Sequence, residues 1–239
     1  MPEVRTAYDR VILKVSGETL SADSGSPFSP EALDLLISRI REGLETGCRF
    51  GIVCGGGNII RGKLTGRGHL ERTTADGMGM LSTVINGLAI RDGLERTGIP
   101  ARLFSIIPVG ILAEPYSPRC GRAALENGEV AIFSGGTGNP YVSTDTAAVL
   151  RGCDIGAGVI LKATTVDGIY SADPKIDPGA RRYERISYEQ ALAEDLKIMD
   201  GPAIALAREN RIAVIVFDFR EENAVRRAVS GESVGTILN

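Results

Sequence analysis

Residues 134–148 combine a glycine-rich turn, several hydroxyls and one carboxylate directly ahead of a predicted helix. The apolar run Val130–Phe133 precedes them, so we expect this loop at the carboxyl end of a strand, where open α/β sheets bind ligands. Glycines let a ligand approach the backbone, and helix N-termini attract anions. The segment therefore predicts a phosphate or nucleotide site, although a plain turn with Thr144 or Asp145 as helix N-cap fits the same residues.

Two lysines interrupt strands that are otherwise apolar. Lys14 lies in Val11–Val15 and Lys162 lies in Val159–Ala163, each just ahead of a turn. A buried ammonium group is costly unless an anion accompanies it. One such lysine could simply reach solvent at a sheet edge. Two at the same edge favour a clamp on a phosphoryl group in transfer, because that reaction is accelerated mainly by positioning and by fixed positive charge.

Other groups are expected at the same edge. Gly55–Gly57 would contribute backbone N–H groups and Arg61 a guanidinium, while Asp145 would orient the lysines or help to hold magnesium. The segment Gly57–Leu64 fits the spacing of a P-loop, but Leu64 stands where that loop needs a serine or threonine. No dinucleotide-binding glycine motif opens a helix after a strand.

Composition narrows the possible functions. The 239 residues carry a formal net charge of −3, which gives no basic footprint for nucleic acid. A single histidine, His69, argues against a histidine-based metal site or a Ser-His-Asp system. No apolar stretch approaches the ~18 residues of a membrane span, and the N-terminus lacks a signal peptide, so we expect a cytoplasmic protein. The four cysteines have no metal-ligand spacing and are predicted to be buried or half-buried free thiols: Cys48, Cys54, Cys120 and Cys153.

Apolar runs alternate with helical patterns along the chain. Ser29 and Pro30 open a helix as N-cap and first-turn proline, and Gly47 closes it. Further helices are expected after residue 144, at about Asp76–Arg96, and near 188–196, 202–210 and 222–230. The expected strands are Val11–Val15, Phe50–Cys54, Ala101–Ile107, Val130–Phe133, Val159–Ala163 and Ala213–Phe217. Strands this apolar predict an α/β fold with helices on both faces of the sheet, and the loop 165–187 is the best candidate for a functional excursion.

Nearly the whole chain resembles the bacterial uridylate (UMP) kinases of the amino acid kinase superfamily. The motifs that carry this resemblance are Lys14–Glu18, Gly55–Gly62, Asp76–Met80, Gly136–Pro140, Ser143–Ala148, Leu161–Gly168, Ala172–Pro174 and Met199–Asp200. The resemblance implies one amino acid kinase domain over residues 1–239, a three-layer α/β/α sandwich around a mostly parallel sheet. Its N-terminal part would mainly bind UMP and form a homohexamer, and its C-terminal part would mainly bind ATP.

The resemblance also assigns roles to single residues. Lys14, Lys162 and Asp145 would be catalytic. The ATP side would comprise Lys14, Val15, Ser16, Gly17, Gly57, Arg61, Thr164, Tyr170 and Asp173. The UMP side would comprise Gly56, Asp76, Thr137, Gly138, Asn139, Pro140, Tyr141, Val142, Ser143 and Thr144. Their chemistry fits, because Tyr170 offers a flat face to a base, Asp76 can accept bonds from ribose hydroxyls and Asn139 can read uracil edges. Packing of Tyr170 in its loop and a helix cap at Asp76 are the ordinary alternatives.

Partners and cofactors follow from the same resemblance. Magnesium would enter as Mg-ATP with no direct protein ligand, UTP would inhibit, and GTP is a possible effector, although Glu95 and Glu129 stand where GTP-activated members often carry basic residues. Two alternatives remain open at this point. A relative could phosphorylate a carboxylate or carbamate, or the fold could serve as a nucleotide-binding metal-storage protein.

Overall fold

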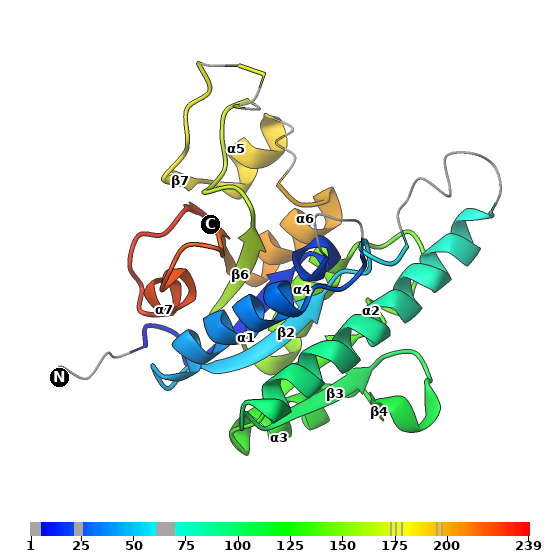
Figure 1. Ribbon diagram of the computed structural model, residues 1–239. Helices are drawn as coiled ribbons and strands as arrows, with labels where there is room; N and C mark the ends of the chain where they lie inside the picture. The colour runs from blue at the N-terminus through cyan, green and yellow to red at the C-terminus, as the bar shows by residue number, and fades with distance from the viewer. Residues whose placement is uncertain are drawn as a thin grey trace.

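The computed structural model describes residues 6–21, 26–60, 70–172, 174, 176–177, 179–194, 196 and 198–239 (Figure 1). Within them, nine strands form one sheet in the order β4-β3-β5-β2-β1-β6-β8-β9-β7. The strands are β1 (Arg10–Val15), β2 (Arg49–Cys54), β3 (Ala101–Ser105), β4 (Glu114–Pro115), β5 (Val130–Ser134), β6 (Val159–Thr164), β7 (Arg185–Ile186), β8 (Ala213–Asp218) and β9 (Thr236–Leu238). Every pairing is parallel except that of β8 with β9. The predicted mostly parallel sheet is therefore confirmed.

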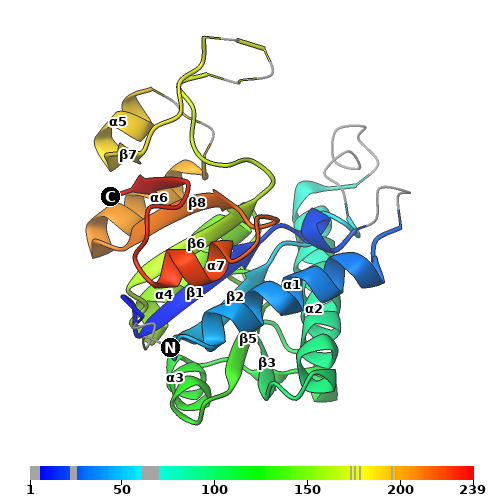
Figure 2. The same ribbon diagram turned by 60° about the vertical axis from the view of Figure 1, so that its left-hand side comes forward.

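Helices cover both faces of this sheet, as the two views show (Figures 1 and 2). One face carries α1 (Pro30–Leu44), α2 (Arg72–Arg96) and α7 (Ala224–Val229). The other carries α3 (Pro118–Glu126), α4 (Thr144–Ile155), α5 (Tyr188–Ala193) and α6 (Gly201–Asn210). Short 3-10 turns follow β1 at Gly17–Leu20 and β3 at Gly110–Leu112. The expected three-layer α/β/α arrangement is present.

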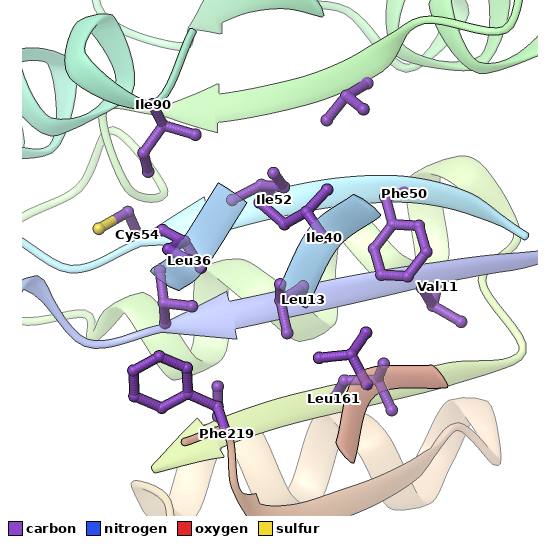
Figure 3. Close-up of a cluster of buried hydrophobic side chains, with 14 of the residues drawn as sticks. Val11, Leu13, Leu36, Ile40, Phe50, Ile52, Cys54, Ile90, Leu161 and Phe219 are labelled. Atoms are coloured by element: carbon purple, nitrogen blue, oxygen red, sulfur yellow. The ribbon is translucent and has the colours of Figure 1, made fainter. Parts of the chain in front are cut away.

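Side-chain alternation along the central strands divides the core into two layers. Val11 and Leu13 of β1 pack with Leu36 and Ile40 of α1 on one face (Figure 3), and Ile12 points into the opposite cluster under α4. Each of these side chains is at most 1 % exposed. Because Lys14 follows the same period of two as Ile12, its side chain lies on the α4 face.

Hydroxyl N-caps set where several helices begin. Ser29 accepts a bond from Ala32 N and is followed by a proline, as the sequence predicts. Ser117 and Pro118 repeat this signal at α3, a helix that was not among the predicted ones. Ser143, rather than Thr144 or Asp145, caps α4 by accepting from two backbone amides. The turn-and-cap alternative for Asp145 is therefore wrong, because Ser143 already fills that role.

Some predicted boundaries differ from the observed ones. Helix α2 begins at Arg72, four residues before the predicted start, so Asp76 lies inside its first turns and the helix-cap alternative for Asp76 is wrong. Strand β3 ends at Ser105, whose hydroxyl donates to Ile107 O and turns the chain. The four cysteines are unpaired as predicted, with Cys48 and Cys54 buried. Among the described residues, no helix is long and apolar enough to cross a bilayer.

Candidate active site

Lys14 and Lys162 are exact neighbours in the pairing of β1 with β6, and both contact one carboxylate. Lys14 Nζ lies 2.7 Å from Asp145 Oδ1, and Lys162 Nζ lies 2.7 Å from Asp145 Oδ2. Lys162 Nζ also donates to the carbonyl of Ile198. The three charged side chains are 11–13 % exposed. Two ammonium groups around one carboxylate leave a net charge of about +1 in a mostly dehydrated place, which favours a polyanionic ligand.

Charge and burial act against each other within this cluster. Burial alone would raise the pKa of the Asp145 carboxyl, but the charges of Lys14 and Lys162 outweigh it and hold that pKa below the ordinary aspartate value. Burial lowers the pKa of Lys162, with the ammonium of Lys14 adding to that effect and Asp145 opposing it. The carboxylate is thus ionised at neutral pH and keeps both lysines directed toward it.

A second carboxylate fixes the start of α4. Asp200, just before α6, accepts bonds from the hydroxyls of Ser143 and Thr146, the latter at 2.8 Å. Ser143 in turn accepts from Asp145 N at 3.1 Å. The Asp145 side chain is therefore left free to meet the lysines, and its backbone is tied to the segment whose Ile198 carbonyl binds Lys162.

A cavity of about 370 Å³ lies on one side of the cluster. It brings together most of the residues predicted for the UMP side with one predicted for the ATP side: Gly56, Asp76, Thr137, Asn139, Val142, Thr144 and Gly57. Asp76 accepts a bond from Tyr141 N at 2.8 Å and pairs with Arg72 at 2.8 Å. Burial would raise the pKa of Asp76, but these two donors lower it overall. We call this the acceptor cavity.

Not all of the predicted UMP-side residues line this cavity. Gly138, Pro140, Tyr141 and Ser143 are absent from its lining. Tyr141 is 67 % exposed and has a positive φ of 69°, with its ring under the Arg72 guanidinium. Ser143 has its hydroxyl engaged by α4 and Asp200. These residues shape the loop around the cavity through its backbone.

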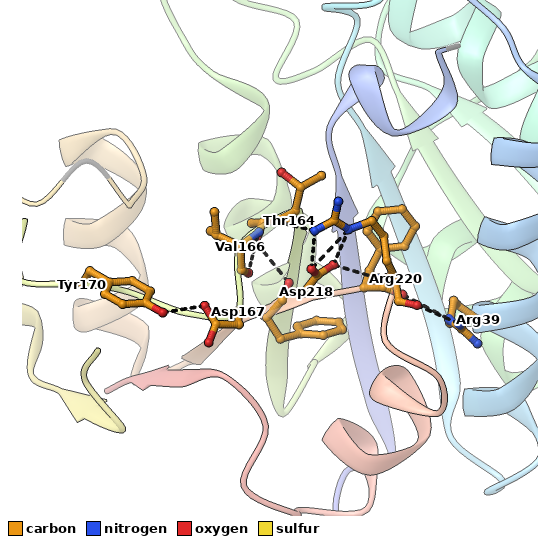
Figure 4. A network of polar contacts seen from close by, with 10 residues as sticks. Arg39, Thr164, Val166, Asp167, Tyr170, Asp218 and Arg220 are labelled. Atoms are coloured by element: carbon orange, nitrogen blue, oxygen red, sulfur yellow. Dashed lines mark hydrogen bonds and ion pairs between the residues drawn. The ribbon is translucent and has the colours of Figure 1, made fainter. Parts of the chain in front are cut away.

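A second cavity, of about 650 Å³, lies on the other side of Lys162. We call it the donor cavity; its lining includes Lys162, Thr164 and Tyr170, all predicted for the catalytic or ATP side. The Tyr170 hydroxyl donates to Asp167 at 2.8 Å, as drawn in Figure 4, so the hydroxyl is engaged within the loop. Lys162 thus belongs to the cluster and to the donor cavity at once, while Thr144, next to Asp145, lines the acceptor cavity.

The predicted ATP-side turn after β1 packs tightly against the glycine run after β2. A Cβ atom placed on Gly17 would lie 2.7 Å from Gly55 O and 2.8 Å from Gly57 N, so only glycine fits there. Ser16 caps the following turn by accepting from Glu18 N. The Val15 side chain is fully buried in the α1 layer, so only its backbone faces this edge. Arg61 and Asp173 lie outside the described residues.

Sequence reasoning missed much of both linings. On α2, the missed acceptor residues are Arg72, Ala75, Gly79, Met80 and Thr83. They lie three or four positions from Asp76 or from one another, so helical periodicity would have found them once the helix was started at Arg72. Among the missed donor residues are Val166, Ile169, Pro174, Leu196 and Ile198. Val166, Ile169 and Pro174 fall within the loop 165–187, which the sequence does mark as a functional excursion, but irregular spacing does not single out individual residues.

Comparison with known proteins agrees with this geometry. The sequence profile of the amino acid kinase family matches residues 9–218, and the chain therefore belongs to that family. Within it, the chain is similar to the uridylate kinase of Legionella pneumophila strain Paris. The two are 47 % identical over 231 residues, which is 97 % of this chain and 94 % of the relative. The resemblance drawn from the sequence motifs is confirmed.

Solved structures show the same likeness in three dimensions. The UMP kinase of Bacillus anthracis superposes with a TM-score of 0.94 at 36 % identity, covering 97 % of this chain and 96 % of that one. The UMP kinase of Ureaplasma parvum gives a TM-score of 0.91 at 35 % identity, covering 97 % and 98 %. The uridylate kinase of Archaeoglobus fulgidus gives 0.72 at 26 % identity, covering 96 % and 99 %. The fold is thus that of UMP kinase structures throughout.

Proposed function

We propose that this protein is a UMP kinase that reversibly transfers the γ-phosphate of ATP to UMP, giving UDP and ADP. The observation that carries the proposal is the Lys14–Asp145–Lys162 cluster, set in strand register between two cavities. The similarity to uridylate kinases supports the choice of UMP as acceptor. Production of a nucleoside diphosphate from UMP would place the enzyme in pyrimidine nucleotide biosynthesis.

The chemistry asks little of the protein beyond charge and position. A nucleoside monophosphate has a second phosphate pKa of about 6, so it is already mostly dianionic at neutral pH and needs no general base. The two lysines would neutralise the charge that spreads over the transferred phosphoryl group. Asp145 would hold both ammonium groups at the point where the two substrates meet.

Magnesium would arrive with the nucleotide. Among the described residues, no group of three or more His, Cys, Asp or Glu side chains could hold a metal ion. The one carboxylate within the cluster, that of Asp145, forms ion pairs with both lysines. This donor set fits a cation held mainly by the phosphates of ATP. When bound, Mg²⁺ would screen the charge between the two polyanions.

The substrate sides follow the two cavities. We assign UMP to the acceptor cavity, with Asp76 toward the ribose and the 136–144 loop toward uracil and phosphate. We assign ATP to the donor cavity, with Tyr170 beside the base. The N-terminal part of a single kinase domain would thus mainly bind UMP and the C-terminal part mainly ATP. Assembly into a homohexamer, a cytoplasmic location and the absence of nucleic-acid or membrane partners stay predictions from the sequence.

Regulation is proposed in the same way. UTP would inhibit by resembling the acceptor nucleotide. GTP is less favoured than UTP as an effector. Arg102 is paired with Glu114 and lies 3.7 Å from Glu129, which stands where GTP-activated members often carry a basic residue. Carboxylates there would repel the negative charge of a triphosphate.

A coupled assay of ADP release tests the proposal. Mg-ATP is supplied with UMP, CMP, dUMP or an acylated glutamate, and UTP is added to one series. Turnover with UMP alone, suppressed by UTP, is the expected result. Turnover with the acylated glutamate would instead identify a carboxylate kinase. No turnover with any acceptor would overturn the proposal and favour the nucleotide-binding metal-storage alternative.

A further inference from the structure

Helix α2 bonds to two glycine loops through side chains one turn apart. It lies along the sheet beside β3 and β5 (Figure 2). Thr83 Oγ1 accepts from Gly135 N at 2.7 Å and donates to Met80 O at 2.7 Å. Asn86 Nδ2 donates to Gly55 O at 2.6 Å. One rigid element therefore contacts the loop after β5 and the loop after β2.

Asn86 also forms a reciprocal amide pair with Asn58. Asn86 Nδ2 donates to Asn58 Oδ1 at 2.8 Å, and Asn58 Nδ2 donates back to Asn86 Oδ1 at 3.0 Å. Asn58 Nδ2 also donates to Pro27 O at 2.8 Å. Asn86 is 0 % and Asn58 9 % exposed. Buried amides are costly unless every group is paired, so a fully paired set fixes one relative placement of the segments it joins.

Close packing at two glycines further restricts how these segments can move relative to one another. A Cβ atom on Gly56 would lie 2.7 Å from both Gly79 O and Ser82 Cβ of α2. A Cβ atom on Gly17 would lie 2.5 Å from Asn58 Oδ1. The turn after β1, the loop after β2 and α2 thus pack so closely that no side chain fits at Gly17 or Gly56. A change in the placement of α2 would be transmitted directly to both loops.

We propose that Thr83 and Asn86 are positioning residues that fix the spacing between the loop Gly55–Gly57 and the loop Gly135–Gly138. The inference rests on the proposed function, in which Gly57 is predicted for the ATP side and Gly56 for the UMP side. Both glycines line the acceptor cavity together with Gly136 of the second loop. Phosphoryl transfer needs the reacting atoms ~3–3.5 Å apart and in line, and a misplacement of about 1 Å can cost ~100-fold in rate. The Thr83 hydroxyl is already used on both sides by backbone groups, so it acts through the loop.

The test compares two substitutions at one position. Thr83→Val keeps the shape but leaves the Gly135 amide without its partner, whereas Thr83→Ser keeps the hydroxyl. We expect kcat with UMP and Mg-ATP to fall about tenfold or more in Thr83→Val. Thr83→Ser should retain most of the wild-type kcat. The KM for each substrate should change less than kcat, because the groups proposed to contact each substrate are all still present. Thermal midpoints are measured for both variants, and kinetics are run well below them.

Asn86→Asp supplies an independent second reading, because it keeps the size but puts a carboxylate oxygen against the Gly55 carbonyl. A loss in kcat is expected there too, and if this variant does not fold, the Thr83 pair decides alone. An active wild-type protein with equal kinetics in Thr83→Val and Thr83→Ser would overturn the inference and leave the proposed function standing. An inactive wild-type protein would instead remove the proposed function, and the inference with it.

Discussion

The acceptor and donor cavities are held in place by different means. The acceptor cavity is built on α2, whose Thr83 and Asn86 make buried bonds to backbone groups of the loops around it. The donor cavity is lined largely by the irregular segment after β6. One buried bond, from Ile169 N to Thr236 Oγ1, holds this segment, together with contacts from exposed arginines such as Arg220, whose side chain is 55 % exposed. Bonds shielded from water are harder to break than exposed ones. The acceptor side should therefore be pre-formed and selective, and the donor side more tolerant of change.

The network on the donor side can be followed in Figure 4. Arg220 Nη2 donates to Thr165 O at 2.8 Å, and Arg220 Nε donates to Asp218 Oδ1 at 2.9 Å. Arg39, from α1, donates to the carbonyls of Phe219 and Arg220 at 3.1 and 2.9 Å. Arg39 and Phe219 are buried, whereas Arg220 is exposed. The segment after β6 is thus linked to α1 through the exposed Arg220 and the buried Arg39.

Lys162 lies in the cluster between the two cavities, so its loss should impair the reaction whichever cavity is considered. We expect Lys162→Ala to lower kcat by about 100- to 1,000-fold, because one fixed positive charge at the transferred phosphoryl group is lost. Steady-state kinetics with both substrates varied measures this. Far-UV circular dichroism should show the fold intact. A change in KM alone would contradict the assigned role.

Asp76→Ala should affect the acceptor side alone. The variant loses the carboxylate that accepts from Tyr141 N and pairs with Arg72, and with it the proposed ribose contact. Hydrogen bonds to charged groups are worth ~1.5–3 kcal/mol, so the KM for UMP should rise about 10- to 100-fold. Asp92→Ala on the same helix is the matched control, since Asp92 is exposed and pairs with the exposed Arg96 at 3.7 Å. An equal rise in the KM for ATP would break the contrast.

The regular parts of this comparison were readable from the sequence. Lys14 and Lys162 stood out because an ammonium is unusual in an apolar strand, and the structure places them side by side with Asp145 between them. The apolar residues of the strands likewise predicted a sheet covered by helices on both faces. Such signals are local, because residue type alone predicts burial, and the carboxyl end of a strand is where a ligand is expected.

The features that could not be predicted from the sequence depend on contacts between distant residues or on helix starts that carry no capping signal. The start of α2 was missed because Glu71 makes no side-chain cap bond, so no capping signal precedes Arg72. The link from Arg220 to Thr165 joins residues 55 positions apart with no shared pattern. Helix α3 is different, because Ser117 and Pro118 gave the same signal as Ser29 and Pro30. That helix was predictable.

Arg220→Ala should give a smaller effect, confined to the donor side. The variant removes the donor to Thr165 O, which is one of the bonds that hold the segment after β6. An ordinary hydrogen bond contributes ~0.5–1.5 kcal/mol, so the KM for ATP should rise about two- to tenfold with the KM for UMP little changed. Arg226→Ala is the control, because Arg226 pairs with Glu45 away from both cavities. A larger effect on UMP than on ATP would show that the two cavities are not held separately.

The smallest effect concerns acid stability of the cluster that joins the cavities. The pKa of Asp145 is lower in the folded protein than in the unfolded chain, where it is ~3.9. Its contribution to stability is therefore present above about pH 4 and is lost as pH falls through the lowered pKa. Asp145→Asn has no negative charge to pair with Lys14 and Lys162, so it should be less stable than wild type at neutral pH. It also has no carboxyl group to titrate.

Denaturant unfolding of both proteins from pH 7 to pH 3 should show this difference in unfolding free energy narrowing below pH 4. Subtracting the variant removes the titration of other carboxylates whose pKa is lowered, such as Asp218 beside Arg220. A difference that stays constant, or widens, would mean that the lysines do not stabilise the ionised carboxylate.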